Sequence, residues 1–201
     1  MADDDDVRVR REAPVRDAVR AGDLRTAAAA AIELYGGELA AYLHAIARDD
    51  DLAAEAFATF CEDLCKGLPA FRWDASLRTW SYALARHALF RLKRSPAARR
   101  LVPLEVAPEV LDRAEQIRSA TVQFLRTEVK DGLRQLRDQL APEDHELLIL
   151  RIDRKLAWRD IAIAIGAGDG RTPDQHAAAL RKRFERLKAE LRALAAERGL
   201  V

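Results

Sequence analysis

One stretch of the chain combines cationic and aromatic side chains in a pattern that suits nucleic acid. Phe71, Arg72, Trp73 and Asp74 stand together just before Ser76, which is placed to cap a helix. Aromatic rings stack on bases, guanidinium groups hold phosphates, and a loop that carries both can hold a base that has left the stack. This stretch therefore predicts contact with melted or single-stranded nucleic acid.

The helix expected after Ser76 has two unlike faces. At about 100° per residue, one face collects apolar residues that we expect in a core, namely Leu77, Trp80, Leu84, Ala88 and Leu92. The opposite face collects Thr79, Tyr82, Arg86, Phe90 and Lys93, flanked by Arg78 and Arg94. A core helix explains the first face but not the cations of the second, since Asp74 is the single acid between residues 71 and 100.

A second candidate site lies near the C-terminus, where two helices expected over 156–165 and 173–198 flank a glycine-rich turn at 166–171. A turn between two helices, the second of them basic, is the pattern of a helix-turn-helix, which reads the major groove. The residues placed to contact DNA are Arg171, Thr172, Gln175, His176, Arg181, Lys182, Arg183 and Arg186. A solvated basic helix in an α-hairpin fits this element equally well.

The formal net charge of +1 conceals a strong charge pattern. Residues 1–70 sum to −7 (8 basic, 15 acidic) and residues 71–100 to +7 (8 and 1). Residues 101–150 sum to −4 (6 and 10) and residues 151–201 to +5 (12 and 7). Local charge governs binding, so the two positive blocks indicate where a nucleic acid would bind.

The composition predicts an all-α fold. Thirty-nine Ala and 28 Arg against nine Gly favour helix, and β-branched residues are few. We expect helices over residues 24–47 (broken near 36–37), 51–65 (capped by Asp51), 76–93, 117–140, 142–152, 156–165 and 173–198 (started by Thr172). The predicted organisation is two small helical domains joined by a flexible linker: a disordered acidic tail over 1–15, a first domain over 16–95, a proline-containing linker over 96–116 and a second domain over 117–201.

Other kinds of chemistry find little support. Cys61 and Cys65 lie on adjacent turns and could form a metal or redox site, but no His or Cys neighbours them, so we interpret them as core residues. Phosphate-binding loops, HExxH motifs and nucleophile elbows are absent from the sequence. Neither a signal peptide nor an apolar run of about 18 residues occurs. We expect a cytoplasmic protein without enzymatic activity, cofactor, metal or membrane insertion.

The segment Phe71–His87 (FRWDASLRTWSYALARH) resembles conserved region 2 of bacterial sigma factors, most closely the small extracytoplasmic-function (ECF) type. Residues 35–42 and 57–64 fit the preceding helices of that region. Leu156–Gly166 (LAWRDIAIAIG) is similar to sigma region 4, in which a helix-turn-helix follows. The resemblance covers about residues 24–94 and 125–190, with the linker in the expected place.

This resemblance implies a sigma factor that binds core RNA polymerase and directs promoter recognition, melting and transcription initiation. It implies polymerase contacts from the first helices, at Tyr35, Asp51, Glu55, Phe57, Phe60, Glu62 and Leu64. It implies contacts with the promoter −10 element from Arg72, Trp73, Asp74, Ser76, Arg78, Thr79, Tyr82, Arg86, Phe90, Lys93 and Arg94. The basic C-terminal helix would read the −35 element, an anti-sigma factor is a further implied partner, and we expect the free chain to be a monomer.

The sequence departs from the family pattern at several positions. Trp73 stands where relatives carry a small residue, and Ala54 and Ala58 replace side chains that are often acidic or amide. Ala177–Ala179 replaces polar residues at the start of the recognition helix, so we hypothesise a weak dependence on the −35 element. Two rivals stay open: a sigma-like helical adaptor that binds polymerase or another regulator without reading promoters, and a dimeric helix-turn-helix repressor.

Overall fold

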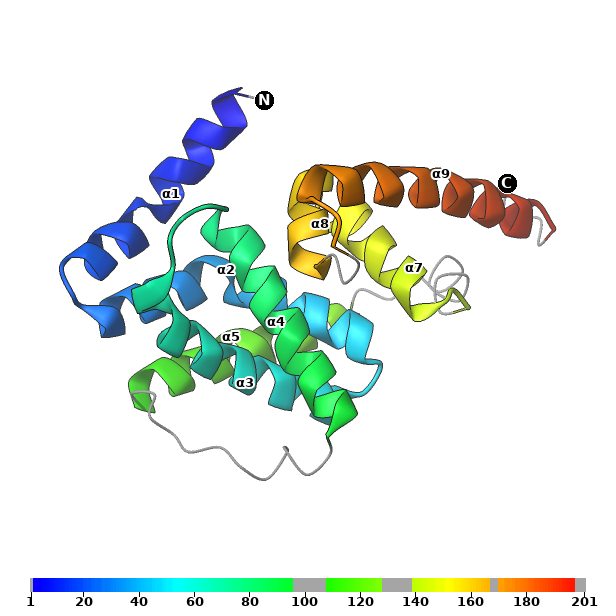
Figure 1. The fold of residues 1–201 in the computed structure, drawn as a ribbon. Helices are drawn as coiled ribbons and strands as arrows, with labels where there is room; N and C mark the ends of the chain where they lie inside the picture. The colour runs from blue at the N-terminus through cyan, green and yellow to red at the C-terminus, as the bar shows by residue number, and fades with distance from the viewer. Residues whose placement is uncertain (1, 96–107, 128–138, 167–169, 198–201) are drawn as a thin grey trace. The chain divides into compact units, whose positions relative to one another are not determined.

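Every regular element of the computed structural model is helical (Figure 1). The structure describes residues 2–95, 108–127, 139–166 and 170–197, and no strand occurs in these ranges. The predicted all-α fold is confirmed. The elements are α1 (Ala2–Arg20), α2 (Leu24–Ala47), α3 (Asp50–Gly67), the 3-10 turn η1 (Leu68–Ala70), α4 (Leu77–Arg94), α5 (Pro108–Thr127), α7 (Pro142–Leu148), the π-helical turn η3 (Ile149–Asp153), α8 (Trp158–Ile165) and α9 (Pro173–Glu197).

The chain divides into two units, residues 1–124 and residues 125–201, which we call the first and second units. In the first unit α3 packs against both α2 and α4, and its core is built from large side chains of these three helices. Tyr42 and Tyr82 are fully buried with their rings edge to face, 5.0 Å between centroids. Aromatic pairs in this geometry add to the stabilisation from burial alone.

Local capping sets the starts of these helices. The carboxylate of Asp23 accepts a hydrogen bond from Thr26 N at 3.0 Å, at the start of α2. Ser76 caps α4 as predicted, accepting from Thr79 N at 3.0 Å. For α3 the cap is Asp49, which accepts from Leu52 N at 2.8 Å, and the prediction of Asp51 was wrong by two residues. Three adjacent aspartates, any of which can cap, made that position ambiguous.

The predicted disordered tail over residues 1–15 is wrong, because α1 is helical from Ala2 to Arg20. Val15 is 1% exposed and Glu12 is 2% exposed, and α1 packs along α2. The run of aspartates in the first turn suggested a solvated tail, yet negative side chains at a helix N-terminus are stabilising. Burial of residues further along α1 then fixes the helix to the unit.

The glycine pair of α2 does not break the helix, contrary to prediction, since α2 is continuous from Leu24 to Ala47. A Cβ atom added at Gly36 would lie 3.3 Å from Ile32 Cγ2 and 3.4 Å from Ile117 Cγ2. The absence of a side chain at Gly36 therefore lets α5 approach α2 closely. The ion pair between Glu33 and Arg113, with Nε to Oε2 at 2.8 Å, also joins these two helices.

This packing corrects the predicted domain boundary. Residues 96–107 of the predicted linker lie outside the described ranges, but residues 108–116 are the start of α5 rather than linker. The first unit extends to Phe124, so the helix expected at 117–140 begins nine residues earlier and belongs in large part to the first unit. Residues 128–138 of that expected helix are outside the described part of the chain.

In the second unit, α8 packs against α9 and α7 also contacts α9. The apolar stripe of α9 is buried within the unit at Ala177, Leu180, Phe184 and Leu187. Trp158 of α8 meets Phe184 edge to face, with centroids 5.4 Å apart. The helix predicted over 142–152 is present but changes to a π-helical turn from Ile149.

Candidate nucleic-acid interface

Three aromatic rings gather at the loop before α4. Phe71 stacks on Trp80, with centroids 4.4 Å apart and planes at 16°, and its ring lies 4.8 Å from that of Trp73. Trp80 was predicted to be core, but it is partly exposed and supports the loop instead. A Cβ atom at Gly67 would lie 2.8 Å from Trp80 Cζ2, so the glycine at the end of α3 makes room for this ring.

Arg72 and Asp74 are the most exposed members of the loop. Their side chains are 84% and 72% exposed and form an ion pair at 2.8 Å. An exposed pair of this kind contributes little to stability, since solvent screens it. Both side chains therefore lie on the surface of the loop.

Two predicted −10 residues face the interior instead. Thr79 is 1% exposed and Tyr82 is fully buried, so neither belongs to an outer face of α4. Their polar groups are satisfied inside the unit: Thr79 pairs with Ser76 Oγ at 2.7 Å, and Tyr82 donates to Glu38 Oε1 at 2.7 Å. Ser76 is partly exposed, and its hydroxyl is engaged in the cap of α4 and in the bond to Thr79.

Arg78 is held by α2. Its Nε lies 3.0 Å from Glu38 Oε1 and 3.2 Å from Oε2, and its NH2 group contacts the same carboxylate. Burial opposes the charge of Arg78, but the hydrogen bonds and negative charge of Glu38 outweigh it and raise the pKa of the guanidinium. Arg78 thus stabilises the packing of α4 on α2.

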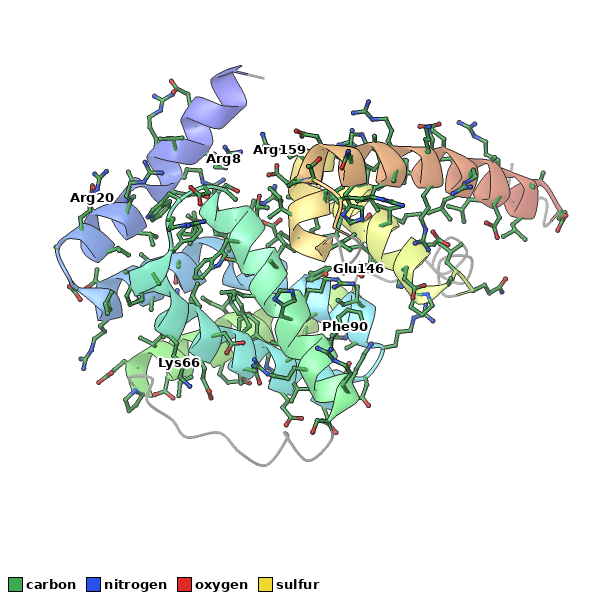
Figure 2. All side chains as sticks on the ribbon, in the orientation of Figure 1. Arg8, Arg20, Lys66, Phe90, Glu146 and Arg159 are labelled. Atoms are coloured by element: carbon green, nitrogen blue, oxygen red, sulfur yellow. The ribbon has the colours of Figure 1, made fainter. Side chains whose placement is uncertain are left out.

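The second half of α4 carries a cation cluster centred on Phe90, which is labelled in Figure 2. Arg86 lies over the Phe90 ring at 4.4 Å and Lys93 at 5.7 Å, while Arg94 Nε donates to the Phe90 carbonyl at 3.3 Å. Positive groups thus surround a ring that is itself partly exposed. A ring for stacking with cations beside it is the arrangement that single-stranded nucleic acid favours.

His87 lies beside this cluster, near Arg86 and Arg94, and was not among the predicted contacts. Partial desolvation, together with the positive charges of Arg86 and Arg94, lowers the pKa of His87. Its neighbour Arg91 is tied to α3 through an ion pair with Asp63 at 2.9 Å.

Most of the predicted polymerase contacts are core residues. Tyr35, Phe57, Phe60, Glu62 and Leu64 are each less than 9% exposed. Burial raises the pKa of Glu62, while Lys66 at 3.8 Å acts in the opposite direction. Asp51 is exposed and Glu55 is half-buried, so these two remain on the surface of α3. The apolar spacing of α3 identified its inner face, and that face packs within the unit.

In the second unit, Thr172 and Gln175 form the predicted capping box. Gln175 N donates to Thr172 Oγ1 at 3.3 Å, and Thr172 N donates to Gln175 Oε1 at 3.0 Å. The cap uses the carbonyl oxygen of the Gln175 side chain, so its amide NH2 group takes no part in the capping box.

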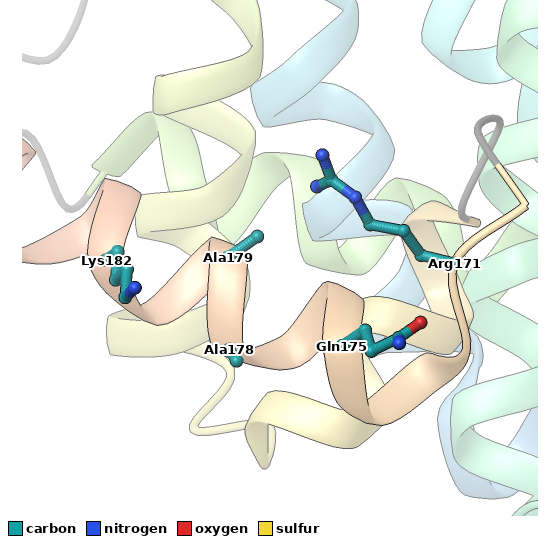
Figure 3. A pocket seen from close by; sticks show the side chains of 5 residues that line it. All are labelled: Arg171, Gln175, Ala178, Ala179 and Lys182. Atoms are coloured by element: carbon teal, nitrogen blue, oxygen red, sulfur yellow. The ribbon is translucent and has the colours of Figure 1, made fainter.

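A shallow depression of about 390 Å³ lies beside this cap, lined by Arg171, Gln175, Ala178, Ala179 and Lys182. Figure 3 shows that Arg171 reaches it from the loop before α9, whereas the other four side chains come from the helix. The two alanines keep the depression open, and a cation borders it on either side. Three of the predicted −35 residues thus surround one concave surface.

The remaining −35 residues of α9 differ in their surroundings. Arg181 and Arg186 are exposed on α9. Arg183 is paired with Asp144 of α7 at 2.6 Å, and this hydrogen bond raises the pKa of Arg183. His176 is partly buried, and its Nδ1 atom is buried without a hydrogen-bond partner. Arg183 therefore joins α9 to α7, and His176 is turned in part toward the interior.

A metal centre finds no support in the described residues. Groups of three or more His, Cys, Asp or Glu side chains that could hold an ion do not occur there. Burial is the main cause that raises the pKa of both Cys61 and Cys65, so the thiols are protonated near neutral pH, and both cysteines are free. Among helices of the described ranges, none is both long and apolar enough to cross a membrane.

Sequence reasoning missed two residues of α1 that reach the loop. Arg16 lies over the Trp73 ring at 4.4 Å, and Glu12 accepts hydrogen bonds from the first residues of α4. The apolar positions Val15 and Val19 beside them gave a weak sign of a helix, but its partner 60 residues away left no local signal.

Comparison with known proteins gives no further guide. No protein-family model matches the chain, and no curated protein or solved structure matches it.

Proposed function

We propose that this protein is a sigma factor of the ECF type, which binds core RNA polymerase, recognises promoter DNA and assists its melting. The observation that carries the proposal is the surface of the first unit formed by the loop rings and the Phe90 cluster. The motif of residues 71–87 supplies the resemblance, and the rings and cations on this surface have the chemistry that a melted strand needs.

The melted −10 strand would use two parts of this surface. Trp73 and Phe71 would stack on a base held out of the duplex, with Arg72 near its phosphate. Phe90, with Arg86 and Lys93 over its ring, would accept the strand further along α4. Polymerase would bind through the outward surface of α3 that includes Asp51 and Glu55, rather than through the buried residues of that helix.

The −35 element would meet the second unit at the depression beside the α9 cap. Because the Gln175 carbonyl oxygen is used in the cap, the side chain would donate its amide hydrogens to an acceptor on a base edge. Arg171 and Lys182 would lie near the flanking phosphates. Few side chains reach out from this surface, which is consistent with a weak dependence on the −35 element.

Run-off transcription with purified bacterial core polymerase on fragmented genomic DNA tests the proposal. The expected result is specific initiation that depends on this protein. Replacement of Arg72 or Phe90 by Ala should lower open-complex formation while binding to core polymerase is retained. Arg192→Ala is the matched control, because this exposed arginine of α9 lies outside both proposed contact surfaces.

A sigma-like adaptor is the second candidate, and a specific observation favours it. Thr79, Tyr82 and Arg78 are engaged inside the first unit, which leaves fewer side chains for the −10 element than the motif implies. An adaptor would bind core polymerase in the same assay without initiating transcription. The dimeric-repressor alternative needs an exposed apolar surface for dimerisation. The apolar residues of α9 over 177–187 do not provide one, because they are buried within the second unit.

A further inference from the structure

Helix α1 fixes the first turn of α4 from outside that helix. The buried carboxylate of Glu12 accepts hydrogen bonds from Leu77 N at 3.2 Å and Arg78 N at 3.1 Å. It also accepts from Tyr35 Oη at 2.8 Å, which ties α1 and α4 to α2. The first N–H groups of a helix have no partner within it, and a negative charge there is favourable. Glu12 and the Ser76 cap together satisfy three of these N–H groups.

Arg16 reaches the same loop one turn further along α1. Its guanidinium lies over the Trp73 ring at 4.4 Å from the centroid, and Phe71 contacts that ring at 4.8 Å. Trp73 has a φ of 63°, in the left-handed region that residues with a Cβ atom disfavour. Such a conformation persists only when its surroundings hold it. Arg16 and Phe71 are side chains that contact the Trp73 ring here.

We propose that Glu12 and Arg16 are positioning residues for the loop Phe71–Ser76, so that α1 is a working part of the promoter-melting site. The inference rests on the proposed function. A loop that must order itself before it can stack on a base loses affinity, and a loop held in advance does not. Glu12 sets where the loop ends, and Arg16 sets the orientation of its central ring.

An occluding role for Arg16 makes the opposite prediction. If the guanidinium merely covered the ring face that a base needs, its removal would increase capture of the melted strand. Positioning predicts a decrease. The sign of the effect of one substitution therefore decides between the two roles.

The test uses the full chain with bacterial core polymerase and a promoter that carries 2-aminopurine in the −10 element. Arg16→Ala is compared with Arg20→Ala, a matched control on the same helix (Figure 2), whose side chain is 72% exposed and pairs only with Asp17 among the ion pairs described. We expect Arg16→Ala to lower open-complex formation about two- to five-fold, which corresponds to the free-energy contribution of a partly exposed cation–π contact. Binding to core polymerase should not change, and Arg20→Ala should resemble the unmodified chain.

Glu12 is tested by a graded pair of variants. Glu12→Gln keeps an acceptor oxygen and Glu12→Ala keeps none, so the glutamine variant should retain more open complex. Hydrogen exchange of the amides of residues 71–79, measured on the free chain, should accelerate in Arg16→Ala and in Glu12→Ala. A purely structural role for Glu12 would instead lower core binding and open-complex formation equally.

Unchanged or increased open-complex formation in Arg16→Ala would overturn the proposal. Unchanged exchange at residues 71–79 would overturn it as well. If the unmodified chain opens no promoter DNA, the proposed function fails, and so does the part of the inference that concerns melting. The exchange result would then still show whether α1 orders the loop.

Discussion

The left-handed backbone at Trp73 allows a sharp stability test. Trp73→Gly and Trp73→Ala both remove the indole and its contacts with Phe71 and Arg16, so these losses cancel when the two variants are compared. What remains is the backbone at a φ of 63°. A residue with a Cβ atom costs about 1–2 kcal/mol there, and glycine avoids that cost.

An opposing effect reduces this advantage. Glycine has more conformational freedom in the unfolded chain, which makes it less favourable than alanine by about 0.5–1 kcal/mol at an ordinary position. The difference leaves Trp73→Gly more stable than Trp73→Ala by about 0–1.5 kcal/mol, with a midpoint near 0.75 kcal/mol. Asp74 supplies the matched control, because it is not among the described residues with positive φ. There the order should reverse, with Asp74→Ala more stable than Asp74→Gly.

Urea unfolding followed by far-ultraviolet circular dichroism measures the four variants without relying on tryptophan emission. The expected result is a preference for glycine at position 73 and for alanine at position 74. A preference for alanine at position 73 as large as that at position 74 would show that the backbone of the loop is not in the left-handed region at position 73.

The remaining predictions concern α4 and the −35 contact. Tyr82→Phe should lower the free energy of unfolding by about 1.5–3 kcal/mol through loss of the hydrogen bond to Glu38, with promoter opening unchanged. Phe90→Ala should instead lower promoter opening and leave the free energy of unfolding unchanged. Urea unfolding and open-complex assays separate the two effects. Because the folded-state pKa of His87 lies below its ordinary value of 6.5, the unfolded chain binds this proton more readily. Stability from His87 is therefore complete above pH 6.5 and falls as pH drops through the folded pKa, so the urea midpoint should decline less steeply toward acid pH in His87→Gln. Mutation of the −35 element should lower promoter affinity less than mutation of the −10 element, and footprints dominated by the −35 element would contradict our hypothesis of a weak dependence on it.

Local signals in the sequence predicted most of the helices after α1, and two of their caps. Ser76 and the Thr172–Gln175 box lie where the capping rules place them, because a cap depends on residues three apart. The starts of α4 and α9 followed from such signals. The end of the helix before η3 did not, since the change to a π-helical turn leaves no mark in residue type.

The orientation of α4 could not be predicted in the same way. Thr79 and Tyr82 are polar, so an amphipathic pattern assigns them to the outside, although both are buried. Their burial depends on Ser76 and Glu38 as hydrogen-bond partners, and Glu38 lies about 40 residues earlier in the chain. Burial of a polar group is tolerated when it is paired, so the identity of distant partners decides the face of the helix.

The positive charge of residues 71–100 does not all serve one purpose. Arg78 and Arg91 are paired with Glu38 and Asp63 of neighbouring helices, so part of the positive charge holds α4 in place. Arg86 and Lys93 lie over the Phe90 ring, and Lys93 Nζ also donates to the Ile46 carbonyl of α2 at 3.2 Å. Local net charge therefore overstates the surface available to a phosphate backbone, while the ring at the centre of the cluster adds a stacking partner that charge alone does not reveal. The two kinds of cation alternate along one helix, so the packing of α4 on α2 and α3 determines which side of it a strand can meet.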